Sequence, residues 1–323
     1  MTHRPVPETD RRGRPTDRLS HQPPRRLPQP KFQSEPLNAT LNSAAIALLG
    51  ILALLAGQQI CLSESPSGLL SLNAGVLTVG VDPHVGGRVA SFKHGQHEAL
   101  RTQRDADHFH WGSTVWIGPQ SDWKWPPSPT IDSRPYKVVR HDDHSIKLES
   151  EIDPETKLQL IKTFGFESDH TEKPVLVARY ELINRGDSVR EAGLWENTRV
   201  DWRGTVACSP SKTVRSSPKD DVIHLEATSP TFSLNEHRIN GQKIFITPKV
   251  GLDELTLSHR YRGYQLIKRW RRPTRVAPGQ AEIEIYFGRD KGFCELENHG
   301  VFAKLLPNQT VRLVTRWTIE TLP

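Results

Sequence analysis

SIKLESEIDPETKLQLIKTFGFESDHTEKPVLVARYELI, residues Ser145 to Ile183, is the stretch that decides the fold class. It contains three apolar segments, and in the first of them every second residue is polar. That period of two predicts a strand with one packed face and one wet face. Residues typical of turns, such as Asp153 and Pro154, separate the segments. The stretch therefore predicts three consecutive β-strands.

The same pattern continues on both sides of this stretch. No run of ten or more residues is apolar at i, i+3, i+4 and i+7, so the sequence predicts no long amphipathic helix. The 25 prolines, 22 glycines and single methionine suit many short strands joined by turns. We therefore expect residues 69–322 to form one all-β domain, a large antiparallel β-sandwich. The further expected strands are VLTVGV (76–81), YKVV (136–139), VIHLEA (222–227), KIFITP (243–248), ELTLS (254–258), AEIEIYFG (281–288) and TVRLVTRWTIETL (310–322).

The N-terminal part has a different composition. Residues 1–42 hold eight prolines and eight Lys or Arg residues, and we interpret them as a disordered basic leader. Residues 43–61 include the uncharged apolar run AAIALLGILALLAG (44–57), which has the length of a signal-peptide core. An uncleaved membrane anchor is the alternative, and residues 62–68 would be a linker. Both alternatives predict an exported protein, periplasmic or extracellular, with a membrane as partner if the segment is retained.

The charge of the chain does not indicate a nucleic-acid partner. The formal net charge is +6, and residues 1–42 contribute +4 of it (eight basic minus four acidic residues), which leaves +2 for the rest. We interpret the basic cluster from Lys268 to Arg272 as a solvated strand end. The three cysteines have no metal-finger spacing and the histidines are scattered, so we expect no metal and no cofactor. Whether Cys208 and Cys294 pair stays open.

A segment rich in tryptophan is the first candidate for a binding site. HFHWGSTVWIGPQSDWKWPPSP (108–129) contains four of the eight tryptophans, and we expect it to be a loop. The rings either plug one end of the sandwich or form a platform for sugar rings. In the second case Trp116, Trp123 and Trp125 would contact the sugar, and Gln120 would donate or accept hydrogen bonds.

Three other segments place polar groups at strand ends. VDPHVGGRVASF (81–92) presents Arg88 directly after two glycines, as a clamp for a polar ligand or as a surface ion pair. LWENTRV (194–200) presents Trp195, Glu196 and Arg199. In FCELENHG (293–300), the side chains of Glu295, Glu297 and His299 share one strand face. The two carboxylates either belong to a site or form a solvated face.

Taken in order along the chain, these segments resemble one family. GGRVASF, WIGPQSDWKWPP, VARYELINRGD with GLWENTRV, and CELENHGVFAKLLPNQTVRLVTRWTI are together similar to the galactose mutarotase-like (aldose 1-epimerase-like) superfamily, in a branch of uncharacterised bacterial proteins. The resemblance spans nearly all of 69–322. It implies a supersandwich of antiparallel strands with a carbohydrate cleft.

The resemblance also implies roles for individual residues. Glu295 or Glu297 would be the base that takes the anomeric proton, and His110 lies near the place of the family's earlier histidine. Where mutarotases have Asn-His before an aromatic pair, this chain has Leu194-Trp195-Glu196-Asn197.

We therefore expect a carbohydrate-binding protein, with sugar epimerase or mutarotase activity as its enzymatic form. The alternative from another class is a non-catalytic envelope or interaction domain that has lost the sugar site. A polysaccharide lyase or hydrolase on a similar sandwich is a third interpretation. The carbohydrate-binding interpretation requires a set of residues to meet in one site: Arg88, Trp116, Trp123, Trp125, Trp195, Glu196, Arg199, Glu295 and Glu297.

Overall fold

A computed structural model describes residues 68–323 apart from 104–108, 169–172, 218–221, 224–230 and 234–239. The expected leader (1–42), the signal peptide or anchor (43–61) and most of the linker lie outside these residues, so export stays a prediction. No helix within the described part is long and apolar enough to cross a membrane.

The larger of the two sheets has twelve strands. Its order is β1 (Leu70–Ala74), β2 (Leu77–Asp82), β3 (Arg88–His94), β5 (Ser113–Gly118), β10 (Arg190–Asp201), β19 (Phe293–His299), β18 (Ile283–Gly288), β15 (Gln242–Pro248), β12 (Ser211–Ser217) and β13 (Val222–Ile223). The short strands β4 (His97–Glu98) and β20 (Ala303–Leu305) pair with β3 and β10.

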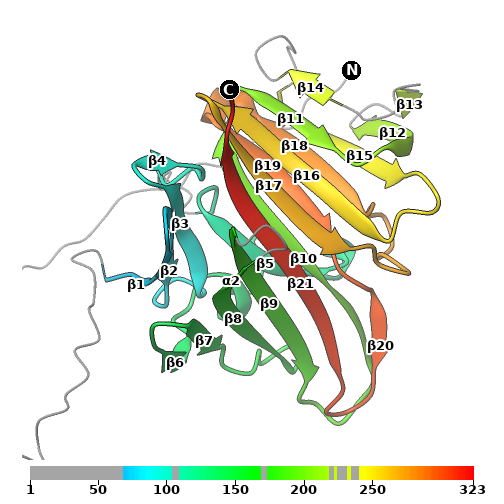
Figure 1. The fold of residues 1–323 in the computed structure, drawn as a ribbon. Helices are drawn as coiled ribbons and strands as arrows, with labels where there is room; N and C mark the ends of the chain where they lie inside the picture. The colour runs from blue at the N-terminus through cyan, green and yellow to red at the C-terminus, as the bar shows by residue number, and fades with distance from the viewer. Residues whose placement is uncertain (1–67, 104–108, 169–172, 218–221, 224–230, 234–239) are drawn as a thin grey trace, which may run out of the picture. The chain divides into compact units, whose positions relative to one another are not determined.

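The second sheet has nine strands. Its order is β14 (Thr231–Ser233), β11 (Thr205–Cys208), β16 (Glu254–Tyr261), β17 (Tyr264–Arg271), β21 (Thr310–Thr321), β9 (Pro174–Asn184), β8 (Leu158–Ser168), β7 (Ser145–Glu149) and β6 (Lys137–His141). The C-terminal strand β21, red in Figure 1, lies in the middle of this sheet between β17 and β9. The helical elements described are three short ones, η1 (Gln120–Asp122), α2 (Pro129–Asp132) and η2 (Arg289–Lys291). The expected all-β antiparallel sandwich is confirmed.

The stretch that decided the fold class forms β7, β8 and β9, which are neighbours in the nine-stranded sheet. Their alternate residues Ile146, Leu148, Leu160, Phe164 and Leu182 have no exposed surface and belong to the core. Burying such side chains contributes about 1.5–3 kcal/mol each relative to exposure. Of the expected strand VIHLEA, only Val222 and Ile223 are described, and they form β13.

The sequence suggested that the tryptophan-rich segment is a loop, but part of it forms a strand. Ser113 to Gly118 form β5, which pairs with β10 along six residues. Five of its six residues are buried and Ile117 is half-buried, so the strand has no wet face and the alternation that marks a half-exposed strand is missing.

The basic cluster at 268–272 also differs from the expectation. It lies at the end of β17, where Lys268 and Trp270 have no exposed surface and Arg271 is exposed. Lys268 points between the sheets, so the solvated interpretation holds for Arg271 and fails for Lys268. The cysteines do not pair with each other: Cys208 is on β11 and Cys294 on β19, in different sheets, and both keep their thiols.

Candidate functional site

Strand β10 separates two polar environments on the two faces of the twelve-stranded sheet. Glu196 points toward the nine-stranded sheet, where its carboxylate accepts a hydrogen bond from Tyr180 Oη (2.6 Å) and pairs with Lys268 Nζ (2.9 Å). Because successive side chains of a strand alternate between its faces, Trp195, Asn197 and Arg199 point to the opposite, outer face.

The strand register places partners beside these three residues. Trp195 lies opposite Trp116 of β5 and His299 of β19, and Arg199 lies opposite Glu295. Asn197 lies opposite Thr114 and Glu297, which are its neighbours on the two sides. Cross-strand partners share one face of a sheet. We call this group, together with Glu284 of β18 and Lys243 of β15, the outer-face site.

Aromatic rings surround the outer-face site. Trp116 makes edge contacts with Trp195, Trp123 and Trp125, with ring centroids 5.0, 6.2 and 5.7 Å apart. His110 stacks on Phe293, the first residue of β19, at 4.6 Å and lies 6.0 Å from Trp125. The tryptophans differ in exposure: Trp116 is buried with only 2% exposed, as the packing interpretation expects, and Trp125 is 49% exposed.

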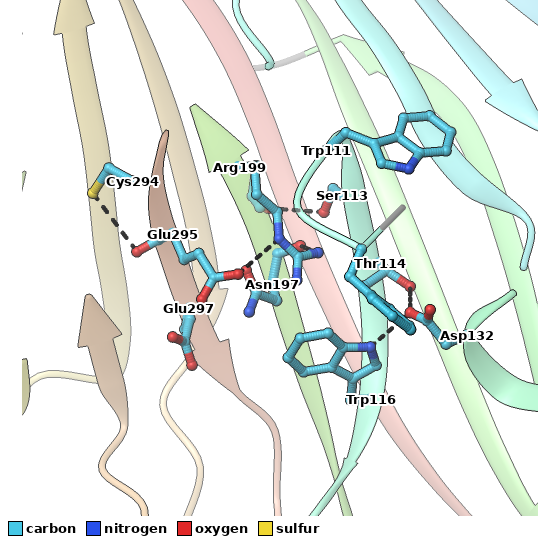
Figure 2. Close-up of polar contacts among 12 residues, drawn as sticks. Trp111, Ser113, Thr114, Trp116, Asp132, Asn197, Arg199, Cys294, Glu295 and Glu297 are labelled. Atoms are coloured by element: carbon cyan, nitrogen blue, oxygen red, sulfur yellow. Dashed lines mark hydrogen bonds and ion pairs between the residues drawn. The ribbon is translucent and has the colours of Figure 1, made fainter. Parts of the chain in front are cut away.

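One carboxylate of the site is held by an arginine. Arg199 Nε donates to Glu295 Oε1 at 2.9 Å, and its guanidinium carbon lies 4.8 Å from the Trp116 ring. Figure 2 shows Arg199, Glu295, Glu297 and Asn197 side by side, with Trp116 next to them. On the other side of Trp116, its Nε1 donates to Asp132 Oδ1 at 2.7 Å, which fixes the plane of the indole.

Two further carboxylates share one lysine. Lys243 Nζ lies 2.6 Å from Glu284 and 2.9 Å from Glu297. Burial, with the nearby Glu284 and Glu295 carboxylates, raises the pKa of Glu297 to about 8 against the attraction of Lys243. Although burial opposes it, attraction by His299 and Lys243 lowers the pKa of Glu284 to about 2. Near neutral pH, Glu297 therefore holds a proton and Glu284 is ionised.

Glu284, Glu297 and His299 offer ligand atoms within 4.8 Å of one another, a spacing that a metal ion can use. The Lys243 ammonium already lies between the two carboxylates, where it neutralises them. A cation there would have to displace Lys243, so the residues do not favour a metal centre.

Several buried polar atoms of the outer-face site make no hydrogen bond within the described residues. They are Trp195 Nε1, both side-chain atoms Oδ1 and Nδ2 of Asn197, Arg199 Nη2 and Glu297 Oε1. Each such atom costs roughly 1–3 kcal/mol when it is buried without a partner. Five of them together, on two paired strands, indicate a place where a polar ligand or water supplies the missing partners.

The structure brings most of the sequence-predicted site residues to this place. Trp116, Trp195, Arg199, Glu295 and Glu297 form its base, and Trp123, Trp125 and His110 come from the segment beside it. Three residues lie elsewhere.

Glu196 does not line the outer-face site, because it points into the space between the sheets. Arg88 is fully buried and donates to Asp132 and to the carbonyl oxygens of Phe109 and Trp111. It holds the aromatic segment in place rather than clamping a ligand. Gln120 is exposed in η1.

Sequence reasoning missed Asn197, Lys243 and Glu284 as site residues. The alternation along β10 was the available signal for Asn197, since it shares a face with Trp195 and Arg199. Nothing in the sequence pairs β15 and β18 with β19, so Lys243 and Glu284 had no such signal.

Comparison with known proteins gives the family. The sequence family described as Domain of unknown function (DUF4380) matches residues 68–320. The chain belongs to this family. The DUF4380 match therefore covers nearly the whole described part of the chain. No curated protein matches this chain.

Solved structures share the fold of this DUF4380 protein. One is a galactose mutarotase-like protein from Lactobacillus casei, with a TM-score of 0.57 and 11% identity over 78% of this chain and 100% of that one. Another is a putative aldose 1-epimerase from Escherichia coli K12, with a TM-score of 0.53 and 12% identity over 79% and 99%. A GalM/aldose epimerase homologue from C. elegans has a TM-score of 0.50 and 11% identity over 79% and 99%. At these identities the likeness shows the galactose mutarotase-like fold alone.

Proposed function

We propose that this protein binds a carbohydrate at the outer-face site. The observation that carries the proposal is the set of five buried, unpartnered polar atoms on Trp195, Asn197, Arg199 and Glu297. Sugar hydroxyl groups both donate and accept hydrogen bonds, so a saccharide can supply partners to the donors and to the acceptors in this set.

The surroundings of these atoms suit a sugar as well. Indole rings of Trp116, Trp123 and Trp195 lie within 6.4 Å of one another, and Trp125, which is 49% exposed and packs against Trp116, offers apolar surface to the C–H groups of a pyranose. The shared fold with a galactose mutarotase-like protein and a putative aldose 1-epimerase supports the same class of ligand.

A second function, interconversion of sugar anomers, is favoured by Glu297 itself. Its pKa of about 8 lies near neutral pH, where a group can both take up and release a proton. In its ionised form Glu297 takes the proton of the anomeric hydroxyl, a histidine gives a proton to the ring oxygen, and the ring opens to the aldehyde. Ring closure on the other face returns both protons.

His299 fits the role of that acid, because it lies on the same strand face as Glu297, with its Nε2 3.4 Å from Glu284. His110, the histidine expected from the sequence, stacks on Phe293, four residues along β19 from Glu297, and fits the role less well. Of the two glutamates expected as the base, Glu297 fits better than Glu295, because Glu295 is bound by Arg199 and Glu297 Oε1 has no partner.

The test is a titration of the purified full-length chain with a panel of neutral monosaccharides. Binding is measured by the change in tryptophan fluorescence and by calorimetry. Asn197→Ala removes two hydrogen-bonding atoms from the site, and we expect it to weaken binding about ten-fold or more. Arg271→Gln changes an exposed arginine outside the site and should bind like the wild type.

Anomer exchange measured by NMR separates the two functions. We expect Glu297→Gln to bind sugar and to lose the exchange rate, with His299→Gln and His110→Gln identifying the acid. Binding without exchange in the wild type would contradict catalysis and leave sugar binding standing. Titrations that stay flat with every sugar would contradict both and favour the non-catalytic interaction domain.

A further inference from the structure

A cavity of about 1030 Å³ lies where several strands of both sheets end. We call it the strand-end pocket. Its walls are residues 96–103, Asp201 at the end of β10 with Trp202 and Arg203 after it, the turn between β16 and β17, and η2 with Gly292. None of the residues assigned above to the outer-face site lines this pocket.

Aromatic rings and cations line the strand-end pocket together. Trp202, Tyr261 and Tyr264 supply the rings. The Arg203 guanidinium carbon lies 5.0 Å from the Tyr261 ring, and that of Arg262 lies 5.1 Å from the same ring. His97 stacks on Tyr264 at 3.9 Å. This combination of flat rings and guanidinium forks suits a ligand that has both apolar faces and negative charge.

Among the described residues, three carboxylates line the pocket, and each is engaged by a protein group; that of Asp290 accepts a hydrogen bond from Asn240 Nδ2 at 2.5 Å. Asp201 accepts two hydrogen bonds from the Arg203 guanidinium, at 2.8 and 2.7 Å. Glu98 accepts hydrogen bonds from the backbone amides of Phe92 and Leu100, and burial raises its pKa. Within the described residues, Arg262 pairs with no carboxylate, although it is exposed at the pocket wall. The guanidinium of Arg262 is thus available to an anion.

The backbone at Arg262 is unusual for an arginine. Tyr261 pairs with Tyr264, so Arg262 and Gly263 form a two-residue hairpin turn with φ of 51° and 77°. Turns with positive φ at both central residues favour Asn, Asp or Gly at the first one. An arginine at this position is therefore unusual, and it lies in the wall of the strand-end pocket.

The strand-end pocket adjoins the outer-face site at one ring. Arg101, a pocket residue, has its guanidinium carbon 5.7 Å from the ring of Phe293. Phe293, Glu295 and Glu297 are alternate residues of β19 and share one face. The distance along the strand from Glu297 to Phe293 is about 13 Å, at 3.3 Å for each residue. A ligand that reaches both places is longer than a monosaccharide.

We propose that the strand-end pocket binds the carboxylate-bearing part of an acidic oligosaccharide, of the uronate type, while another ring of the same chain occupies the outer-face site. This inference rests on the proposed sugar binding at the outer-face site and names the class of saccharide. Arg262 provides the charge that selects it, and Trp202 and Tyr264 provide ring-stacking surface.

The test uses the full-length chain and three ligands: a uronic-acid oligosaccharide, a neutral oligosaccharide of the same length, and a neutral monosaccharide. The variant is Arg262→Asn, which suits the turn and removes the charge, and Arg271→Gln is the control. We expect the wild type to bind the acidic chain about ten-fold more tightly than the neutral one, and added NaCl to reduce that difference. Arg262→Asn should lose most of the preference and keep its affinity for the monosaccharide.

The outcomes separate this inference from the proposed function. Two results would overturn carboxylate binding in the strand-end pocket and leave the outer-face site standing. One is equal affinity of the wild type for acidic and neutral chains, and the other is equal weakening of both by Arg262→Asn. Acidic-chain binding that is lost in Arg262→Asn but unchanged in Asn197→Ala overturns the outer-face site and keeps the pocket. Absence of binding to all three ligands overturns both.

Discussion

At the scale of single residues, neighbouring charges make chemically identical side chains behave differently. Glu284 and Glu297 lie opposite each other on β18 and β19 and share Lys243, yet the pKa of one is lowered and that of the other is raised. His299 makes the difference, because it interacts with Glu284 at 3.4 Å. Two carboxylates with separated pKa values are the usual arrangement for an acid and a base in one site.

The raised pKa of Glu297 predicts a dependence of stability on pH. An unfolded glutamate has a pKa of about 4.3, so between pH 4.3 and about 8 the folded state binds the extra proton. The stabilisation is complete below pH 4.3 and is lost as the pH rises through about 8. In the wild type we expect the urea concentration at the unfolding midpoint to decrease as the pH is raised from 6 to 9. Glu297→Gln should not show this decrease. An identical pH profile in the two proteins would contradict the raised pKa.

At the scale of elements, the turn between β2 and β3 positions the aromatic segment. Gly86 N donates to Arg134 O at 2.9 Å, and a Cβ at Gly86 would lie 1.9 Å from the carbonyl oxygen of Asp132 in α2. Arg88 follows this turn and binds the Asp132 carboxylate, which also accepts from Trp116. The turn, α2 and β5 are therefore packed as one unit beneath the site.

This packing makes Gly86→Ala a test of the element. Gly75 is a matched control, since it also has positive φ (58°) and an added Cβ there would meet nothing within 4 Å. We expect Gly75→Ala to lower the free energy of unfolding by about 1–2 kcal/mol through backbone strain alone. Gly86→Ala should cost about 1–3 kcal/mol more because α2 must move. Chemical denaturation of both variants measures the difference, and equal losses would show that the contact is not tight.

At the scale of the whole described domain, the two sheets are joined by a buried polar cluster as well as by apolar packing. Lys268 of the nine-stranded sheet pairs with Glu196 of the twelve-stranded sheet and donates to Thr198 and Asn298. Burial lowers the pKa of Lys268, and the attraction of Glu196 opposes that effect. Breaking such a pair leaves one charge buried without its partner.

We therefore expect Glu196→Gln and Lys268→Met each to lower the free energy of unfolding by about 3 kcal/mol. The double variant should lose clearly less than the sum, because neither charge is then left alone. As a control, Glu167→Gln breaks the exposed Arg179–Glu167 pair and should cost less than about 1 kcal/mol. Denaturant unfolding of the four variants gives these values, and strictly additive losses would mean that the two residues are not coupled.

The sequence by itself determined the fold class and half of the site. Period-two alternation in Ser145 to Ile183 predicted strands, and the same alternation placed Glu295, Glu297 and His299 on one face, because a strand has only two faces. From the family resemblance, the late glutamates were expected at a carbohydrate site, and the structure puts them on β19, which pairs with β10 and its Trp195.

Only the tertiary structure decided which strands are neighbours, and with that the rest of the site. The pairing of β19 with β18 and of β18 with β15 brings Glu284 and Lys243 to Glu297, although Lys243 is more than fifty residues away along the chain. The pairing of strands and the packing of the sheets also decided that the Glu196 side chain points between the sheets and that Lys268 is buried there. Alternation gives the period of a strand but not which face is covered, because the covering residues come from other strands.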